Sequence, residues 1–272
     1  MNIDRPIFIV GPHRSGTTLL YQLLGRHPDV GYFNRMNRRL RGKPITSHIL
    51  TSIGMRGDHP MEAQRIWDRF KQRDDDVMTA DDASPKVVAW YRNLVGQVLK
   101  LRNANRFLAK YPRLSLRLSW IDEVFPGVIF LHMTRDWRAV VNSTAGKKVK
   151  RDKRNGRWFG VHIPNWRNLE GISHEVASGR VFRYVNRLLE KEALRFNGRF
   201  FTVSYEGLCY NPTGTLHDIA DACDLPWDDR FSLTIPKEFK CANFKWREEL
   251  DPSVIESIRE EDPEFYRRYE KD

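Results

Sequence analysis

The sequence is poor in cysteine, with only Cys209, Cys223 and Cys241 among its 272 residues. The number is odd and no C-x-x-C pair occurs, which argues against a disulfide framework and against a cysteine-based zinc site. We therefore expect three reduced thiols and no bound metal.

Long apolar runs are also absent. No stretch approaches the roughly 18 consecutive apolar residues that a membrane-spanning helix needs. The first residues lead straight into a short apolar run at Ile7–Val10, without a signal-like segment before it. We expect a cytoplasmic protein with no transmembrane segment, although peripheral contact with a membrane stays open. The length suits one large α/β domain or one domain with a sizeable insertion.

Acidic residues are fewer than basic ones, 35 against 46, and the formal net charge is +11. An excess of this size concentrates anions near the surface. Two segments carry much of it: Arg35, Arg38, Arg39, Arg41 and Lys43, and then Lys147, Lys148, Lys150, Arg151, Lys153, Arg154 and Arg157. The excess of positive charge would suit an anionic ligand or an acidic acceptor. Alternatively, the two basic segments are ordinary loops exposed to solvent. We expect no nucleic acid, because no helix-turn-helix, zinc finger or aromatic RNA-binding pattern accompanies the charge.

The first motif is a strand, a glycine-bracketed loop and a helix. Ile7–Val10 is an unbroken apolar run typical of a strand buried on both faces of a parallel sheet. Gly11 and Gly16 bracket a tight turn, and leucines recur at helical spacing after it. The unpaired backbone N–H groups at the start of that helix point back at the loop, so the sequence predicts an anion site there.

The loop has the G-x-x-x-x-G spacing of a nucleotide-triphosphate P-loop but lacks its lysine. Thr17 stands where that lysine should follow. A γ-phosphoryl transfer would lose one of its main electrostatic supports without it. Arg14 and the hydroxyl groups of Ser15, Thr17 and Thr18 form a set suited to a dianion with an attached sulfonate.

A second strand–turn–helix motif lies downstream. Val128–Met133 is apolar and of strand length, and it opens into a segment that contains Arg135 and Ser143. A guanidinium offers parallel donors to a phosphate, and a serine hydroxyl on the following helix adds another. We interpret the pair as a second phosphate site, with a surface arginine and an ordinary helix serine as the alternative.

The two motifs together resemble those of the sulfotransferases, which use 3′-phosphoadenosine 5′-phosphosulfate (PAPS) as donor and release adenosine 3′,5′-bisphosphate (PAP). Gly11-Pro-His-Arg-Ser-Gly-Thr-Thr18 is similar to the 5′-phosphosulfate loop of that family. The family's 3′-phosphate element is matched by Arg135 and Ser143. The resemblance implies that Arg14, Ser15, Gly16, Thr17 and Thr18 bind the 5′ end of the donor.

Three further residues inherit roles from the resemblance. Lys110, at the end of an apolar run before Tyr111-Pro112, matches a position where an ammonium stabilises the transferring sulfonate or the leaving phosphate. Lys245 and Arg247 resemble a C-terminal Lys-Trp-Arg segment that closes over the nucleotide, and a surface basic pair is the alternative. The implied mechanism is a metal-independent, in-line transfer to a hydroxyl or an amine.

The sequence lacks the residue that commonly acts as general base in this family. Many relatives place a glutamate shortly after the His-Pro that ends the first helix, whereas here Asn34 stands about at that position. Either the protein has lost activity or the base comes from elsewhere. His59 and His162 are the main candidates because an unperturbed histidine titrates near neutral pH, and Asp58 and Glu62 are the carboxylate candidates.

We predict a three-layer α/β sandwich, P-loop nucleotide-kinase-like, with a central parallel sheet over about 6–10, 107–110, 128–133 and 200–205. Helices are expected over 87–101 and 180–196. One sulfotransferase domain would span 1–272, with acceptor-facing insertions at about 35–85 and 147–178. Within them we expect a lysine-rich loop after Ser143, and the acidic stretch Asp74–Asp76 is most simply a solvated loop.

Three functions stay open. The first is sulfonate transfer, to a small molecule, a glycan, a lipid or a peptide tyrosine. The second is a non-catalytic PAP- or anion-binding protein of the same fold, which the missing glutamate suggests. The third is a P-loop kinase-like phosphotransferase, which would need ATP and magnesium.

Overall fold

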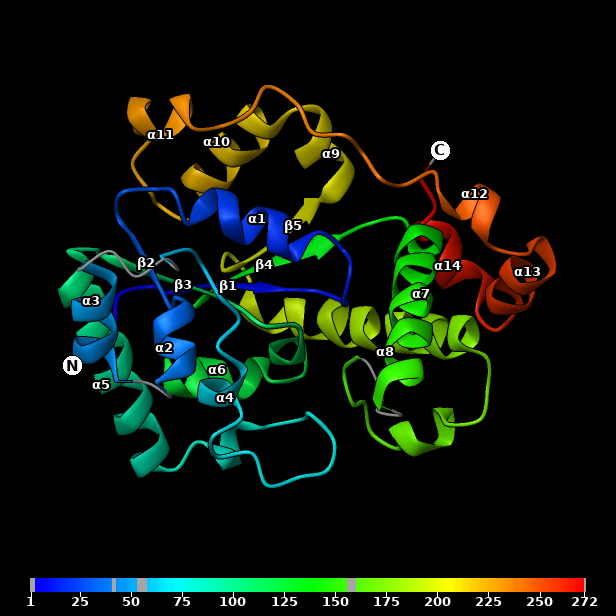
Figure 1. Cartoon of the computed structure of the whole chain (residues 1–272), viewed down its shortest axis with the longest axis horizontal. Helices are drawn as coiled ribbons and strands as arrows, with labels where there is room; N and C mark the ends of the chain where they lie inside the picture. The colour runs from blue at the N-terminus through cyan, green and yellow to red at the C-terminus, as the bar shows by residue number, and fades with distance from the viewer. Residues whose placement is uncertain (1–2, 41–42, 53–57, 156–159, 272) are drawn as a thin grey trace.

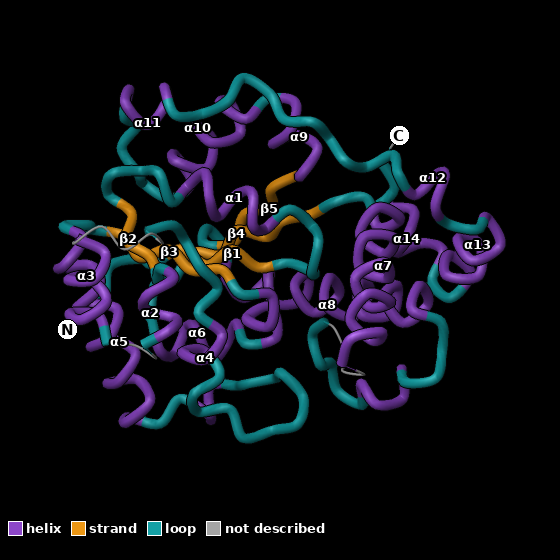
Figure 2. The backbone as a smooth tube through the Cα atoms, in the orientation of Figure 1, coloured by secondary structure: helices purple, strands orange, loops and turns teal. Residues whose placement is uncertain are grey.

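A five-stranded parallel sheet forms the centre of the computed structural model (Figures 1 and 2). The structure describes residues 3–40, 43–52, 58–155 and 160–271, with the backbone alone for 50–52 and 147–155. The strand order is β2-β3-β1-β4-β5. The strands are β1 (Ile7–Val10), β2 (Val30–Tyr32), β3 (Arg106–Lys110), β4 (Ile129–Thr134) and β5 (Phe200–Ser204).

Helices cover both faces of the sheet. One face packs on α1 (Thr17–Leu24), α9 (Tyr205–Tyr210) and α10 (Pro212–Ala222), and the other on α5 (Pro85–Arg102), α6 (Leu118–Val124) and α8 (His174–Ala193) (Figure 1). Alternate residues of each strand enter the two cores. Ile7 and Ile9 belong to the first core and Phe8 and Val10 to the second. The predicted three-layer α/β sandwich is confirmed.

The remaining helices are shorter or lie outside the two main layers. They are α2 (Arg35–Arg39), α3 (Pro44–Ser52), α4 (Gln64–Trp67), α7 (Trp137–Asn155), α11 (Asp229–Leu233), α12 (Trp246–Glu249), α13 (Pro252–Glu260) and α14 (Pro263–Arg268), with 3₁₀ turns at Ala80–Asp82, Pro112–Leu116, Trp166–Leu169 and Leu194–Phe196. Over the described ranges, none of the helices has both the length and the apolar character that crossing a bilayer requires.

The four predicted strands are confirmed to within about one residue at each end, and the structure adds β2. This strand lies just before the predicted insertion 35–85 and pairs in parallel with β3 at the edge of the sheet. Its three residues, Val-Gly-Tyr, are too few to show a periodic pattern. The helix predicted over 180–196 begins earlier, at His174, where Ser173 accepts a hydrogen bond from the Val176 N–H.

The lysine-rich stretch after Ser143 is helical through Asn155 and not a loop. Lysine and arginine are good helix formers, so the helix that starts at Trp137 continues through them. The side chains of 147–159 lie outside the described residues, and so does any role predicted for that basic segment.

The acidic stretch is not simply a solvated loop, because Asp76 is buried and paired. Its carboxylate lies 3.2 Å from Arg113 Nη1, and its Oδ2 accepts a hydrogen bond from the backbone N–H of His162 at 2.7 Å. The fully buried Arg117 donates to the Asp76 carbonyl and to Asp68 Oδ1. Asp76 therefore holds the loop after α4 against the segment at His162.

A buried histidine in β4 makes the stability of the fold depend on pH. Burial lowers the pKa of His132 to about 4, and its Nε2 lies 2.9 Å from Asn186 Oδ1 on α8. Between pH 6.5 and 4 the unfolded chain therefore binds a proton that the folded chain does not. The free energy of unfolding should fall by roughly 3 kcal/mol on this account as the pH drops through that window.

We expect His132→Gln to flatten this part of the stability curve, measured by urea unfolding at several pH values. His217→Gln, at an exposed histidine on α10, is the control and should keep the native slope. An unchanged slope in His132→Gln would show that other groups cause the acid sensitivity.

Candidate functional site

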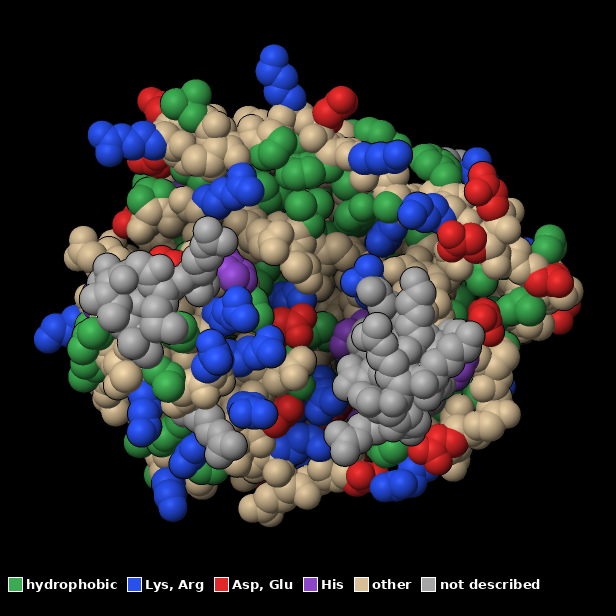
Figure 3. Space-filling view, in the orientation of Figure 1, with side chains coloured by type: hydrophobic (Ala, Val, Ile, Leu, Met, Phe, Trp, Pro, Cys, Tyr) green, Lys and Arg blue, Asp and Glu red, His purple; other side chains and the backbone are tan. Residues whose placement is uncertain are grey.

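An open cleft of about 640 Å³ lies at the carboxyl ends of the central strands. The face in Figure 3 shows a hollow near its middle with Lys and Arg side chains around it. This edge of a parallel sheet is the usual place for ligands in such folds. The cleft is lined by His13, Arg14, Gly16, Thr17, Thr18, Glu62, Gln64, Lys110, Pro112, Arg135, Ala139, Asn142, Ser143, Gly146, Tyr205, Ala242, Lys245, Trp246 and Glu249.

The loop between β1 and α1 forms one wall of the cleft. Gly16 immediately precedes α1 with a φ of 96°, where a side chain is strained, and an added Cβ would lie 2.4 Å from Tyr205 Cδ2. Arg14 also has a positive φ of 69°. The first N–H groups of α1 point toward the cleft, which favours an anion there.

Arg14 joins the two predicted phosphate elements. Its Nε donates to Ser143 Oγ on α7 at 2.9 Å, and its carbonyl accepts from Arg135 Nη1 at 2.8 Å. Positions more than 120 residues apart in sequence therefore face one ligand space. A molecule with an anionic group at each end fits this arrangement better than a single small anion does.

The Arg135 guanidinium is held on three sides. Besides the Arg14 carbonyl, it donates to Ala242 O at 2.9 Å and through Nε to Asn243 Oδ1 at 2.8 Å. Its central carbon lies 4.1 Å from the centre of the Tyr205 ring. These bonds use three of its five N–H donors, which leaves one on each terminal nitrogen for a phosphate.

Glu206 supports Arg135 through Asn243. Glu206 Oε1 accepts from Asn243 Nδ2 and from the Asp136 N–H, and Oε2 accepts from Ser204 Oγ. We expect Glu206→Gln to weaken binding of PAP, the nucleotide that the sequence predicts for this cleft, about tenfold, because the charge-assisted hydrogen bonds to Asn243 and to the Asp136 N–H become weaker neutral ones. Donor KM should rise with kcat little changed.

Isothermal titration with PAP and initial-rate kinetics check this prediction. Glu238→Gln, at an exposed glutamate, is the control and should bind PAP like the native chain. Unaltered PAP affinity in Glu206→Gln would mean that Arg135 is positioned without it.

Lys110 ends β3 inside the cleft and touches a carboxylate. Its side chain is only 3% exposed, and Nζ donates to Thr18 Oγ1 at 2.7 Å and to Glu62 Oε1. Burial lowers the pKa of Lys110, while the Glu62 carboxylate opposes that effect. Glu62 is itself 33% exposed, and with Glu249 on the other wall it gives the cleft two carboxylates among its cations.

Most of the predicted donor-site residues come together in this cleft: Arg14, Gly16, Thr17, Thr18, Lys110, Arg135, Ser143 and Lys245. Two do not line it. Ser15 is buried and donates to Pro12 O at 2.8 Å, so it shapes the loop. Arg247 has its guanidinium 5.1 Å from the Phe244 ring, whereas its neighbour Trp246 lines the cleft.

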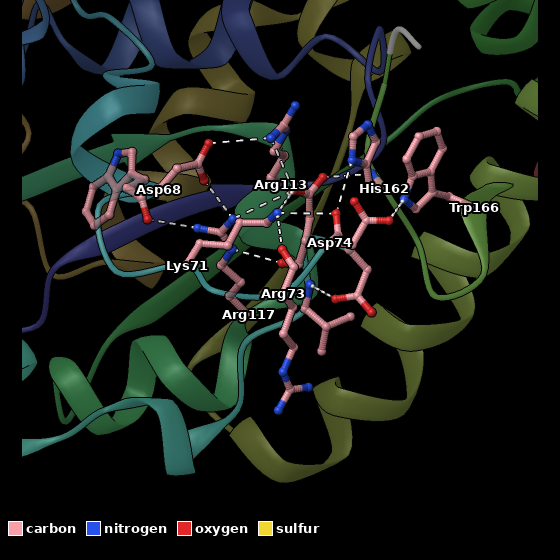
Figure 4. Close-up of polar contacts among 12 residues, drawn as sticks. Asp68, Lys71, Arg73, Asp74, Arg113, Arg117, His162 and Trp166 are labelled. Atoms are coloured by element: carbon pink, nitrogen blue, oxygen red, sulfur yellow. Dashed lines mark hydrogen bonds and ion pairs between the residues drawn. The ribbon is translucent and has the colours of Figure 1, made fainter. Parts of the chain in front are cut away.

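The predicted histidines do not line the cleft. His59 is exposed, and His162 stacks on Trp166 at 4.1 Å between ring centres, beside Asp74 (Figure 4). Asn34, at the position of the missing glutamate, is buried and caps α2 by accepting from the Asn37 N–H. Of the carboxylate candidates, Asp58 pairs with Arg102 and Glu62 lines the cleft.

Sequence reasoning missed Tyr205, which lies under the Arg135 guanidinium. The available indication was its place directly after the last strand, in the stretch Tyr205-Glu206-Gly-Leu208. It also missed Gln64, Asn142 and Glu249 as lining residues. These three follow no family pattern quoted above, so only their position in space identifies them.

Comparisons with known proteins agree on one family. A model described as "Sulfotransferase family" matches residues 6–229. The omega-hydroxy-beta-dihydromenaquinone-9 sulfotransferase Stf3 of Mycobacterium tuberculosis is 27% identical, over 78% of this chain and 61% of its own. Protein-tyrosine sulfotransferase A of Caenorhabditis elegans is 26% identical, over 82% of this chain and 51% of its own. This chain thus spans half to three fifths of the length of these curated relatives.

Solved structures share the fold. Sulfotransferase STF9 from Mycobacterium avium superposes with a TM-score of 0.60 at 16% identity, over 96% of this chain and 76% of that one. The sulfotransferase domain from the curacin biosynthetic pathway gives 0.58 at 14% identity, over 96% and 98%. At these identities the likeness concerns the fold alone.

Proposed function

Because this chain belongs to the sulfotransferase family, we propose that it transfers a sulfonate group from PAPS to an acceptor hydroxyl group. The observation that carries the proposal is the meeting of the two phosphate elements, in which Arg14 contacts both Ser143 and Arg135. A donor with a phosphosulfate at one end and a 3′-phosphate at the other needs an anion site of this double form. PAPS is that donor.

The residues of the cleft divide between the two ends of the donor. We assign the 5′ end to Arg14, Gly16, Thr17, Thr18 and the N-terminus of α1. The 3′-phosphate would be held by Arg135, Ser143 and Lys245. The fixed guanidinium of Arg135, with two N–H donors left over, fits a phosphate in two-pronged contact.

Two predicted residues take indirect roles in this proposal. Ser15 keeps the loop in shape through Pro12 O. Arg247 lies on α12, two positions after Lys245. Its contact with the nucleotide stays a prediction. A cytoplasmic location and a metal-independent reaction also stay predictions from the sequence.

The chemistry we propose is an in-line displacement. The acceptor oxygen forms a bond to sulfur while the bond from sulfur to the 5′-phosphate oxygen breaks, and PAP leaves with the electron pair. Lys110, Arg14 and the loop N–H groups stabilise the negative charge that grows on the leaving phosphate. Holding both reactants in line supplies a further part of the acceleration.

We propose Glu62 as the general base that takes the acceptor proton. Unlike His59 and His162, it lines the cleft, and it contacts the same Lys110 that we assign to the leaving group. A base must come within hydrogen-bond reach of the proton it removes, so position decides among the candidates. The two histidines stay predictions without support from their position.

We assign the acceptor to the side of the cleft formed by the first predicted insertion, against which the second one packs. Glu62 and Gln64 come from the first insertion, 35–85, and line the cleft. Asp76 in the same insertion binds the backbone of His162 in the second, 147–178. The named relatives act on a hydroxylated menaquinone derivative and on protein tyrosine, so a hydroxyl acceptor on a lipid or a peptide has the most support.

Calorimetric titration with PAP and, separately, with ATP plus magnesium tests the donor. We expect tight PAP binding and weak ATP binding, and the reverse would favour the kinase alternative. Incubation with PAPS carrying a radioactive sulfonate and a panel of hydroxyl acceptors then tests transfer. PAP binding without transfer to any acceptor class would favour the non-catalytic binding protein, which the carboxylate of Glu62 in the cleft argues against.

A further inference from the structure

Helices α2 and α3 present an unusual combination of exposed groups. Ile45 and Ile49 lie one turn apart on α3 and are 59% and 54% exposed. The opposite side of α3 is covered, because Pro44 and Ser47 are buried and the helix packs on α2 and α5 (Figure 1). The two isoleucines therefore form an apolar stripe on the outward side of α3, where Thr46 and His48 are exposed as well.

Basic side chains surround this stripe. Arg35, Arg38 and Arg39 on α2 and Lys43 just before α3 are all exposed. Across the ranges that the structure describes, none of these four cations forms an ion pair with a carboxylate, whereas many other arginines of the chain do. The local charge is positive and uncompensated next to two apolar side chains.

We propose that α2 and α3 form a docking surface for the face of an anionic lipid bilayer. Isoleucines would enter the boundary between headgroups and acyl chains, and the cations would contact anionic headgroups. An anionic bilayer supplies both an apolar layer for the isoleucines and a dense negative charge for the cations, whereas a partner with acidic groups alone would leave the isoleucines exposed to water. A partner with a purely apolar surface would leave the four cations without counter-charges.

The position of the surface gives it a use. The Phe33 carbonyl, just before α2, accepts a hydrogen bond from the Met61 N–H at 2.9 Å, and the next residue, Glu62, lines the cleft. Docking by α2 and α3 would therefore bring this wall of the cleft close to the lipid headgroups. The proposal concerns binding only and stands whether or not sulfonate transfer is the activity.

The test is sedimentation of the full chain with vesicles. One set contains phosphatidylcholine with phosphatidylglycerol, and the other contains phosphatidylcholine alone. We expect the chain to bind the vesicles that contain phosphatidylglycerol, and this binding should weaken as salt is added. Vesicles of phosphatidylcholine alone should bind little protein. Arg38→Gln with Arg39→Gln should lower the partition coefficient by about tenfold or more, and so should Ile45→Ser with Ile49→Ser.

Matched controls lie on another part of the chain. Leu194 and Leu233 are 85% and 87% exposed, so Leu194→Ser with Leu233→Ser removes even more exposed apolar surface. Arg230→Gln with Lys237→Gln removes the same charge at exposed positions. All variants should keep the native melting temperature and the native PAP affinity, and both control pairs should bind vesicles like the native chain.

Three results would overturn the proposal. They are the absence of vesicle binding by the native chain, equal binding to both vesicle types, and equal losses in the α2–α3 variants and the controls. Light scattering of the same proteins tests whether the chain self-associates through this surface. If Ile45→Ser with Ile49→Ser dissociated a dimer and left vesicle binding intact, the surface would be a contact between copies of this chain.

Discussion

Replacing Arg135 with alanine is expected to weaken PAP binding by roughly 100-fold or more, which corresponds to about 3 kcal/mol. The guanidinium is almost buried and fixed by Arg14, Ala242 and Asn243, so its two remaining donors are already oriented for a phosphate. The substitution removes a charge that no neighbouring side chain can replace in the same place. Calorimetric titration with PAP measures the loss.

Two controls separate binding from folding. Arg135→Lys keeps the charge but loses the two-pronged contact, and we expect an intermediate affinity. Arg230→Ala removes an exposed arginine on α11 and should leave PAP affinity unchanged. If Arg135→Ala keeps its melting temperature and still binds PAP like the native protein, the 3′-phosphate assignment is wrong.

Replacing Glu62 with glutamine is expected to lower kcat by roughly 10²- to 10⁴-fold, the usual contribution of a positioned base. The amide still offers an oxygen to Lys110 Nζ, so the geometry of the cleft should survive. The donor KM should change little, because Glu62 lies on the acceptor side in our assignment. Steady-state kinetics with a hydroxyl acceptor identified in the panel give both numbers.

Variants of the two candidate histidines serve as the comparison for Glu62→Gln. His59→Gln is expected to keep most of the native kcat, since that side chain is exposed and does not line the cleft. His162→Gln tests the other candidate, with its melting temperature recorded because His162 stacks on Trp166. A large loss of kcat in either histidine variant, with Glu62→Gln near native, would move the base to that histidine.

Structural elements are predicted most accurately from the sequence when the residues that form them are adjacent along the chain. Four of the five strands are short segments rich in apolar residues, of which β1 is unbroken, and the two predicted phosphate elements directly follow β1 and β4. A loop between two glycines and a helix start have their geometry set by near neighbours. For this reason the amino-acid sequence alone points to Arg14 and Arg135, whereas β2, with three residues, is too short to be recognised in it.

The residue type alone is a poor guide where long-range contacts decide the position of a side chain, and the solvated-loop interpretation of the acidic stretch was wrong for this reason. Aspartates in a row normally indicate a solvated loop, but Asp76 is buried because Arg113 and Arg117 reach it from the segment after β3. Histidine is the common catalytic base, but neither His59 nor His162 lines the cleft, whereas Glu62 does, so the role of the two histidines stays a prediction without support from their position. Neither outcome leaves a local trace in the sequence.

Four of the strands, the two strand–turn–helix motifs and the family resemblance thus follow from the sequence alone, because each depends on contiguous residues and local backbone geometry. Tertiary structure decided how these parts combine. Arg14 meets Ser143 across 129 positions, Arg135 meets Asn243 across 108, and Lys110 meets Glu62 across 48. Such pairs form only when the strand order brings β1, β3 and β4 side by side, so their carboxyl ends share one cleft.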